Sequence, residues 1–136
     1  MTTKTSWDGT RLADKIAKAA MRGVVRGTER VRAEMVRLVM ETSKTGRTYQ
    51  RRGVVHQASA PGEPPASDTG NFLRNIQTSF DAEEIAGQVN AGARYSAALE
   101  FGTQKMEPRP FARPAVENTK AEIQADIANE IAKVLT

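Results

Sequence analysis

The sequence predicts an α+β fold in which a long N-terminal amphipathic helix and a C-terminal helix pack on a small antiparallel β-sheet, with a long extended loop after the first helix. Three observations support this prediction. Apolar residues recur at helical spacing near both ends of the chain, they alternate with polar residues in the middle, and a stretch rich in proline and glycine separates the two patterns. The length of 136 residues fits one domain, which we expect to span residues 1–136.

One long helix is predicted from about Arg11 to Thr42, because apolar residues recur there at spacings of three, four or seven. Its length would be on the order of 45 Å, which suggests that another subunit covers part of its apolar face. Gly23 and Gly27 would allow another backbone to approach closely. The apolar face holds Leu12, Ile16, Ala20, Val24, Val31, Met35 and Leu38, and the opposite, basic face holds Lys15, Lys18, Arg22, Arg26, Arg30 and Arg37.

Two segments are predicted to lack helical structure. Residues 1–10 form a polar arm with Trp7, which is either an unremarkable exposed aromatic or an anchor into a neighbouring subunit. Residues 43–69 form a long basic loop with few large apolar residues, in which Val54 and Val55 favour a short strand. A loop of that length is usually functional or disordered.

The rest of the chain alternates short elements before it returns to a helix. We expect a helical turn over Asn71 to Arg74 with Asp68 and Thr69 as caps, a hairpin with its turn at Asp81 to Glu84, and a short helix ended by Gly102. A C-terminal helix is expected over about residues 115–135. The two strands of the hairpin are expected from the alternation of Ile76, Thr78 and Phe80 and of Ile85, Gly87 and Val89. The short helix is expected over residues 93–101, and the C-terminal helix has Thr119, Ile123, Ile127 and Ile131 on one face.

The net charge of +4 is unevenly distributed. Residues 1–60 carry 13 Lys and Arg against five Asp and Glu, whereas residues 61–136 carry seven against 11. Such asymmetry indicates either contact with nucleic acid or contact between the basic half of one copy and the acidic half of another. Composition does not choose between the two.

The chain lacks the residue patterns of enzymes and metalloproteins. There is no cysteine, the single histidine (His56) falls in the predicted loop, and no glycine pattern matches a phosphate-binding loop. Glu83 and Glu84 are adjacent and are interpreted as solvated charges. We therefore expect no catalytic activity, no metal and no cofactor. No apolar run is long enough to span a bilayer, and a protein made and used in the cytoplasm is the default.

Two stretches carry a resemblance to a known family. One is Ser59-Ala60-Pro61-Gly62-Glu63-Pro64-Pro65-Ala66 with Asp68-Thr69-Gly70 and Leu73 after it, and the other is Tyr95-Ser96-Ala97-Ala98-Leu99-Glu100-Phe101-Gly102-Thr103 with Arg109-Pro110-Phe111 and Pro114-Ala115 after it. In this order and spacing they resemble the tail-component family of long-tailed bacteriophages. The resemblance runs from about Leu12 to the C-terminus.

The resemblance implies a structural virion protein without enzymatic activity. Such a protein is assembled in the cytoplasm of the host bacterium and resides in the neck or tail of the particle. It would be one subunit of a six- or twelve-fold ring at the head–tail junction, next to head-closure, tail-terminator or tail-tube proteins, and would contact channel DNA non-specifically at most. The alternative is a small basic nucleic-acid-binding protein.

Two sets of residues are candidates for these contacts. The candidates for a loop that faces the channel or a partner are Arg47, Arg51, Arg52, Pro61, Gly62, Pro64 and Pro65, and those for the subunit contact are Tyr95, Leu99, Glu100, Phe101, Gly102, Thr103, Arg109, Pro110 and Phe111. For the large apolar members of the second set, the alternative is the core of one domain. Because Glu100 would lie unfavourably at a helix C-terminus, we expect it to have a specific partner: Arg109, Arg113 or a backbone amide.

Overall fold

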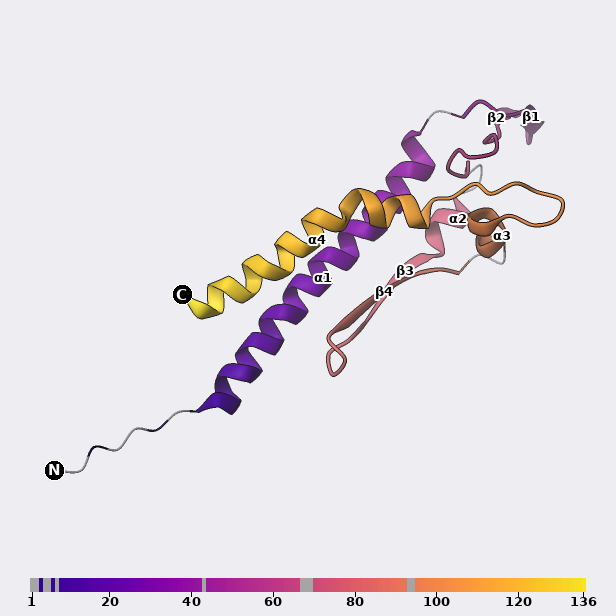
Figure 1. The fold of residues 1–136 in the computed structure, drawn as a ribbon. Coiled ribbons are helices and arrows are strands. Elements are labelled where there is room, and N and C mark those ends of the chain that lie inside the picture. The colour runs from indigo at the N-terminus through magenta and orange to yellow at the C-terminus, as the bar shows by residue number, and fades with distance from the viewer. Residues whose placement is uncertain (1–2, 4–5, 7, 43, 67–69, 93–94) are drawn as a thin grey trace.

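The computed structural model describes residues 3, 6, 8–42, 44–66, 70–92 and 95–136. Over these residues the chain is α+β, with long helices at its two ends and short elements between them, as predicted (Figure 1). The elements are α1 (Gly9–Glu41), β1 (Thr48–Arg51), β2 (Val54–Gln57), α2 (Asn71–Arg74), β3 (Ile76–Asp81), β4 (Ala86–Ala91), α3 (Ser96–Phe101) and α4 (Ala112–Leu135).

The two long helices run antiparallel and side by side. The glycine spacing in α1 has the predicted consequence, because a Cβ atom on Gly23 would lie 2.5 Å from the Cα of Ile127 in α4. A Cβ on Gly27 would lie 2.8 Å from a methyl carbon of Ile123. The close approach is therefore made within one chain, by α4.

The β3–β4 hairpin lies along α1 on a different side from α4 (Figure 1). It is antiparallel, and its register pairs Ile76 with Ala91. The Arg32 Nε donates to the Ile76 carbonyl at 3.0 Å, and the Thr78 hydroxyl donates to Glu29 at 2.9 Å. The predicted hairpin is confirmed, although Ile85 belongs to the turn and has a φ of 51°.

The buried core gathers at the C-terminal half of α1, where α2, β3 and the start of α4 meet it. Val31, Met35 and Leu38 of the predicted apolar stripe are buried there, whereas the stripe residues from Leu12 to Val24 are only half-buried. The periodicity therefore identified the correct face, but the domain covers only one end of it fully. The core residues are Val31, Met35, Leu38, Val39, Phe72, Ile76, Phe111 and Ala115.

The predicted loop over residues 43–69 contains regular structure that the sequence analysis only partly anticipated. Val54 and Val55 do form a strand, β2, and it pairs with β1 in a second antiparallel hairpin. Arg52 and Gly53 at the tip have φ values of 52° and 77°, as a two-residue type I′ turn requires.

The two long helices leave the start of α1 and the end of α4 at the same end of the molecule, opposite the β1–β2 hairpin and α3 (Figure 1). None of the described helices is long and apolar enough to cross a membrane. Trp7, Asp68 and Thr69, for which the sequence suggested an anchor and two helix caps, lie outside the described residues.

Candidate subunit-contact site

The two stretches that carry the family resemblance pack against each other. The Gly62 N–H donates to the Pro108 carbonyl at 2.9 Å, and the Arg109 Nη1 donates to the Ser59 hydroxyl at 3.3 Å. Ser59 is only 4% exposed. The structure thus joins segments about 50 residues apart into one substructure, which we call the motif unit and which comprises residues 59–65 and 95–113.

Glu63 ties the proline-rich part of the motif unit to the end of the first helix. Its carboxylate accepts hydrogen bonds from the backbone N–H groups of Thr45 at 3.0 Å and Ala60 at 2.8 Å, and also from the Thr45 hydroxyl. These bonds favour the charged form and lower the pKa of Glu63 to about 2. The segment is therefore held in a fixed shape by a residue outside the predicted set.

The prolines around Glu63 differ in exposure. Pro61 is exposed, Pro64 is half-buried and Pro65 is buried. Lys44 donates from its Nζ to the Pro64 carbonyl at 2.9 Å, and burial lowers the pKa of this lysine. Of the residues predicted to face the channel or a partner in this segment, only Pro61 and Gly62 are exposed.

Glu100 has the specific partner that its position demanded. Its carboxylate accepts hydrogen bonds from the backbone N–H groups of Phe111 at 2.8 Å, Ala112 at 2.9 Å and Arg113 at 2.8 Å. These N–H groups open α4, so a carboxylate at the end of α3 caps the N-terminus of another helix, where it is favoured. Of the three candidate partners, the backbone amide is the correct one.

A tight loop follows Glu100 and Phe101. Gly102 has a φ of 76°, and its N–H donates to the Ala98 carbonyl at 2.8 Å. A Cβ atom here would lie 2.9 Å from the Met106 carbonyl oxygen, so both the conformation and the space favour glycine. Thr103 and Met106 form an isolated β-bridge that closes the loop. The Arg109 N–H then returns to the Leu99 carbonyl at 2.6 Å.

The aromatic residues of the motif unit divide into core and surface. Phe111 is 1% exposed and packs edge-on against Phe72, with ring centroids 5.0 Å apart. Tyr95 stacks on Phe72, with ring centroids 5.7 Å apart, but is half-exposed, and Leu99 packs partly buried against the core. Phe101 is 79% exposed. The core interpretation therefore fits Phe111, and the surface interpretation fits Phe101. Pro110, which precedes Phe111, is half-buried.

The basic loop residues lie on the β1–β2 hairpin. Arg51 and Arg52 are exposed at its tip, and Arg47 is exposed just before β1. His56 stacks on Tyr49 across the hairpin, with centroids 5.6 Å apart. The hairpin therefore presents two guanidinium groups at the end of a two-stranded ribbon.

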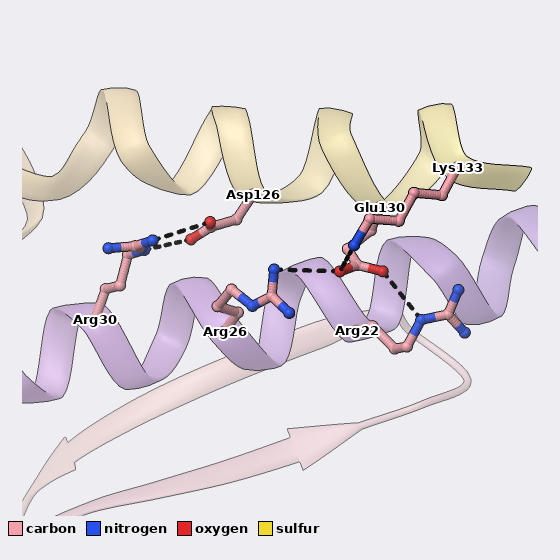
Figure 2. Close-up of polar contacts among 6 residues, drawn as sticks. All are labelled: Arg22, Arg26, Arg30, Asp126, Glu130 and Lys133. Atoms are coloured by element: carbon pink, nitrogen blue, oxygen red, sulfur yellow. Dashed lines mark hydrogen bonds and ion pairs between the residues drawn. The ribbon is translucent and has the colours of Figure 1, made fainter. Parts of the chain in front are cut away.

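The basic face of α1 meets acidic residues of the same chain. Figure 2 shows Arg30 and Arg22 donating to Asp126 and Glu130 of α4. Two of these contacts are Arg30 Nη2 to Asp126 Oδ1 and Arg22 Nε to Glu130 Oε2, each at 3.1 Å. Arg26 Nη1 contacts the Glu130 Oε1 at 3.2 Å. We call this row of contacts the charged seam.

The carboxylates of the charged seam are buried, whereas its arginines remain partly exposed. Asp126 is 6% exposed and Glu130 is 4% exposed. The side-chain hydrogen bonds from Arg30 and from Arg22 lower the pKa of Asp126 and of Glu130, against the opposing effect of burial. Part of the charge asymmetry that suggested contact between two copies is thus paired within one chain, at Arg22, Arg26 and Arg30.

An apolar groove runs along α1 between α4 and the β3–β4 hairpin, with a volume of about 440 Å³. Val24 and Val31 lie at its floor, α4 forms one wall, and the hairpin forms the other. The wall residues are Ala112, Val116, Ile123 and Ile127 on one side and Ile85, Ala86, Gly87 and Val89 on the other.

Sequence reasoning missed three carboxylates that organise the molecule: Glu63, Asp126 and Glu130. Asp126 and Glu130 are four residues apart and flank the apolar face of α4, so the charge asymmetry combined with helical spacing would have identified them as partners of α1. Glu63 lies inside the first resemblance stretch, but no charge or spacing pattern indicated its hydrogen bonds to backbone N–H groups. Within the described ranges, no three His, Cys, Asp or Glu side chains gather where a metal ion would need them.

Comparisons of the chain with protein-family models, with curated proteins and with solved structures found no match.

Proposed function

We propose that this protein is a structural subunit of a tailed phage or phage-like particle, that it forms a ring in the neck or at the point of tail completion, and that it catalyses no reaction. The observation that carries the proposal is the motif unit. The two stretches that resemble the phage tail-component family are in contact with each other through Gly62–Pro108 and Ser59–Arg109. They therefore have a common structural role.

The exposed residues of the motif unit support a role in assembly. Phe101 is an apolar side chain that the fold does not use for its own core. Glu100 and Gly102 on either side of it fix the backbone through hydrogen bonds and a turn. A rigidly presented exposed aromatic residue is typical of a protein–protein contact.

The β1–β2 hairpin supports a position near DNA. Arg51 and Arg52 project from a ribbon that is narrow enough to approach a duplex, and guanidinium groups contact phosphates without regard to sequence. In a ring, each copy would present one such tip towards the channel. We therefore assign non-specific DNA contact to the hairpin rather than to α1, because Arg22, Arg26 and Arg30 of its basic face are paired in the charged seam.

Deletion of the gene in its phage or prophage tests the proposal. We expect filled heads and tails that fail to join, or tails that fail to complete, and few infectious particles by plaque assay and electron microscopy. The wild-type gene supplied in trans should restore the titre. A normal yield of infectious particles without the gene would refute the structural role.

A small nucleic-acid-binding protein is the second candidate, and the basic hairpin is the observation that favours it. The variant Arg47→Ser/Arg51→Ser/Arg52→Ser separates the two. A nucleic-acid-binding protein would lose affinity for duplex DNA, and the salt dependence of its binding would become shallower. A ring subunit would assemble normally and show a defect in DNA retention or ejection from the particle.

A further inference from the structure

An exposed apolar knob and an apolar groove lie on different parts of this chain. The knob is Phe101 with the loop that follows it to Pro108. Phe101 is the most exposed of the large apolar side chains in the described residues. Its loop is closed by the Thr103–Met106 bridge and by the Gly102 turn. The side chain of Phe101 is therefore presented on a fixed backbone and loses little conformational freedom on binding.

The groove between α4 and the β3–β4 hairpin is the complementary feature. Its floor is the part of the α1 stripe around Val24 that the domain leaves only half-buried. Ile85 in its wall is a β-branched residue with a φ of 51°, a conformation that such residues rarely adopt. The apolar side chain is thus kept in the groove wall despite an unfavourable backbone conformation.

The charges around the knob and the groove are also complementary. The knob loop carries Lys105 and Glu107, both exposed. Two exposed charges are neighbours of residues that line the groove: Lys120 follows Val116 by four residues and so shares its face of α4, and Glu84 directly precedes Ile85. Among the described residues, these four side chains form no ion pair. Each surface thus offers one cation and one anion to the other.

We propose that the Phe101 knob of one copy inserts into the groove of a second copy, and that this is the contact that builds the ring. The inference rests on the proposed function and names its interface. Because knob and groove are different surfaces, the contact is heterologous, and repeated copies of it generate a closed ring or an open filament. A pair of copies joined this way still has one free knob and one free groove.

The absence of cysteine from the chain allows a direct test by cross-linking. Full-length Phe101→Cys is mixed with full-length Val116→Cys and treated with a short bis-maleimide. The control partner is Val25→Cys, because Val25 is also an exposed valine on a helix but does not line the groove. We expect a cross-linked dimer from the 101–116 mixture and little from the 101–25 mixture.

Two cross-linking results would overturn the inference. Equal yields with the two partners would show that the groove is not the binding surface. Efficient cross-linking of Phe101→Cys with itself alone would show an isologous contact between two knobs. The double variant Phe101→Cys/Val116→Cys should give a ladder of covalent oligomers, and a ladder that stops at the dimer would likewise contradict a head-to-tail contact.

The variant Phe101→Ala tests the same contact without a reagent. We expect at least a tenfold weaker self-association by native mass spectrometry and sedimentation, as for loss of an interface anchor, with an unchanged melting temperature at dilutions where both proteins are monomeric. Phe80→Ala is the control, since Phe80 is an exposed phenylalanine outside the groove. Unchanged association of Phe101→Ala, or a wild-type chain that stays monomeric at high concentration, would overturn the contact. If the wild-type protein is oligomeric but the 101–116 mixture gives no cross-link, this interface is wrong and the proposed ring is not contradicted. The deletion phenotype tests the phage role independently.

Discussion

The helix pair and the motif unit hold together in different ways. The pair α1–α4 depends on many repeated side-chain contacts: an apolar stripe, two glycines that admit the facing helix, and the charged seam. The motif unit depends on a few single residues, above all Glu63 and Glu100, whose carboxylates accept backbone N–H groups. Repeated contacts tolerate the loss of one member, whereas a single carboxylate with three donors has no substitute.

This difference explains where an interaction surface can form. In the helix pair, Arg22, Arg26 and Arg30 of α1 pair with Asp126 and Glu130 of α4 along the charged seam, so these charges already have partners within the chain. In the motif unit, the carboxylates satisfy the backbone and the small aromatic cluster supplies the burial. Phe101 therefore remains exposed to solvent, on a backbone that the neighbouring hydrogen bonds and the Gly102 turn hold fixed.

The largest expected effect distinguishes the two phenylalanines of the motif unit. Phe111→Ala should lower the free energy of unfolding by about 3–5 kcal/mol, because it removes a fully buried ring from the core. Phe101→Ala should change it by less than about 0.5 kcal/mol in the monomer. Urea denaturation followed by circular dichroism measures both. Similar losses for the two variants would show that Phe101 belongs to the core.

Glu100→Ala should have the next largest effect. It leaves three N–H groups at the start of α4 without their acceptor, and a loss of about 1–3 kcal/mol is expected for unsatisfied partly buried donors. Glu117→Ala is the control, since Glu117 is an exposed partner of Arg113 on the surface of α4, and such pairs contribute little. Thermal melts compare them, and an equal effect of the two would contradict the capping role.

A smaller effect is expected at the glycines of the helix pair. Gly23→Ala should destabilise the protein by about 1 kcal/mol, because the new methyl group meets the backbone of α4 and this clash exceeds the gain in helix propensity. In Gly27→Ala the methyl group meets the Cγ2 atom of Ile123, a β-branched side chain with restricted χ1, rather than backbone. Gly27→Ala should therefore also destabilise the protein in the same melts, but by less than Gly23→Ala. A Gly23→Ala protein more stable than wild type would show that the helices separate freely.

The smallest effect at neutral pH is expected from the charged seam, since its arginines remain partly exposed to solvent. The folded-state pKa values of Asp126 and Glu130 lie below their ordinary values. Their contribution is therefore complete above the ordinary carboxyl pKa of about 4 and is lost as the pH falls towards the lowered values. Asp126→Asn/Glu130→Gln should flatten the pH dependence of the melting temperature below pH 4.5. An unchanged acid profile would contradict the assignment.

The sequence predicted the elements that depend on periodic patterns. The stripe from Leu12 to Leu38 and the alternation around Phe80 identified α1 and the β3–β4 hairpin. The β1–β2 hairpin was missed in part because Thr48–Arg51 has no apolar alternation, and its four residues are all exposed. A strand without a buried face leaves no pattern to read.

The contacts within the motif unit could be predicted from the sequence only in part. The position of Glu100 at a helix end indicated a partner, and one of the three candidates was correct. The contact between Gly62 and Pro108 depends on how two loops pack, which no local rule specifies. For the same reason the sequence did not separate Phe111 from Phe101, since both are phenylalanines flanked by polar and proline residues, and only the packing of α3 places one inside and one outside.

The common location of the start of α1 and the end of α4 has a practical consequence (Figure 1). A fluorescent or gold-binding tag fused at the C-terminus lies at the opposite end of the molecule from α3, Phe101 and the arginine-tipped hairpin. If the chain is a subunit of a particle, as proposed, such a label would report its polarity there without obstructing the proposed contacts. Two labels, one at Leu135 and one at an exposed cysteine introduced at Arg52, would then give the direction in which each subunit points relative to the particle axis.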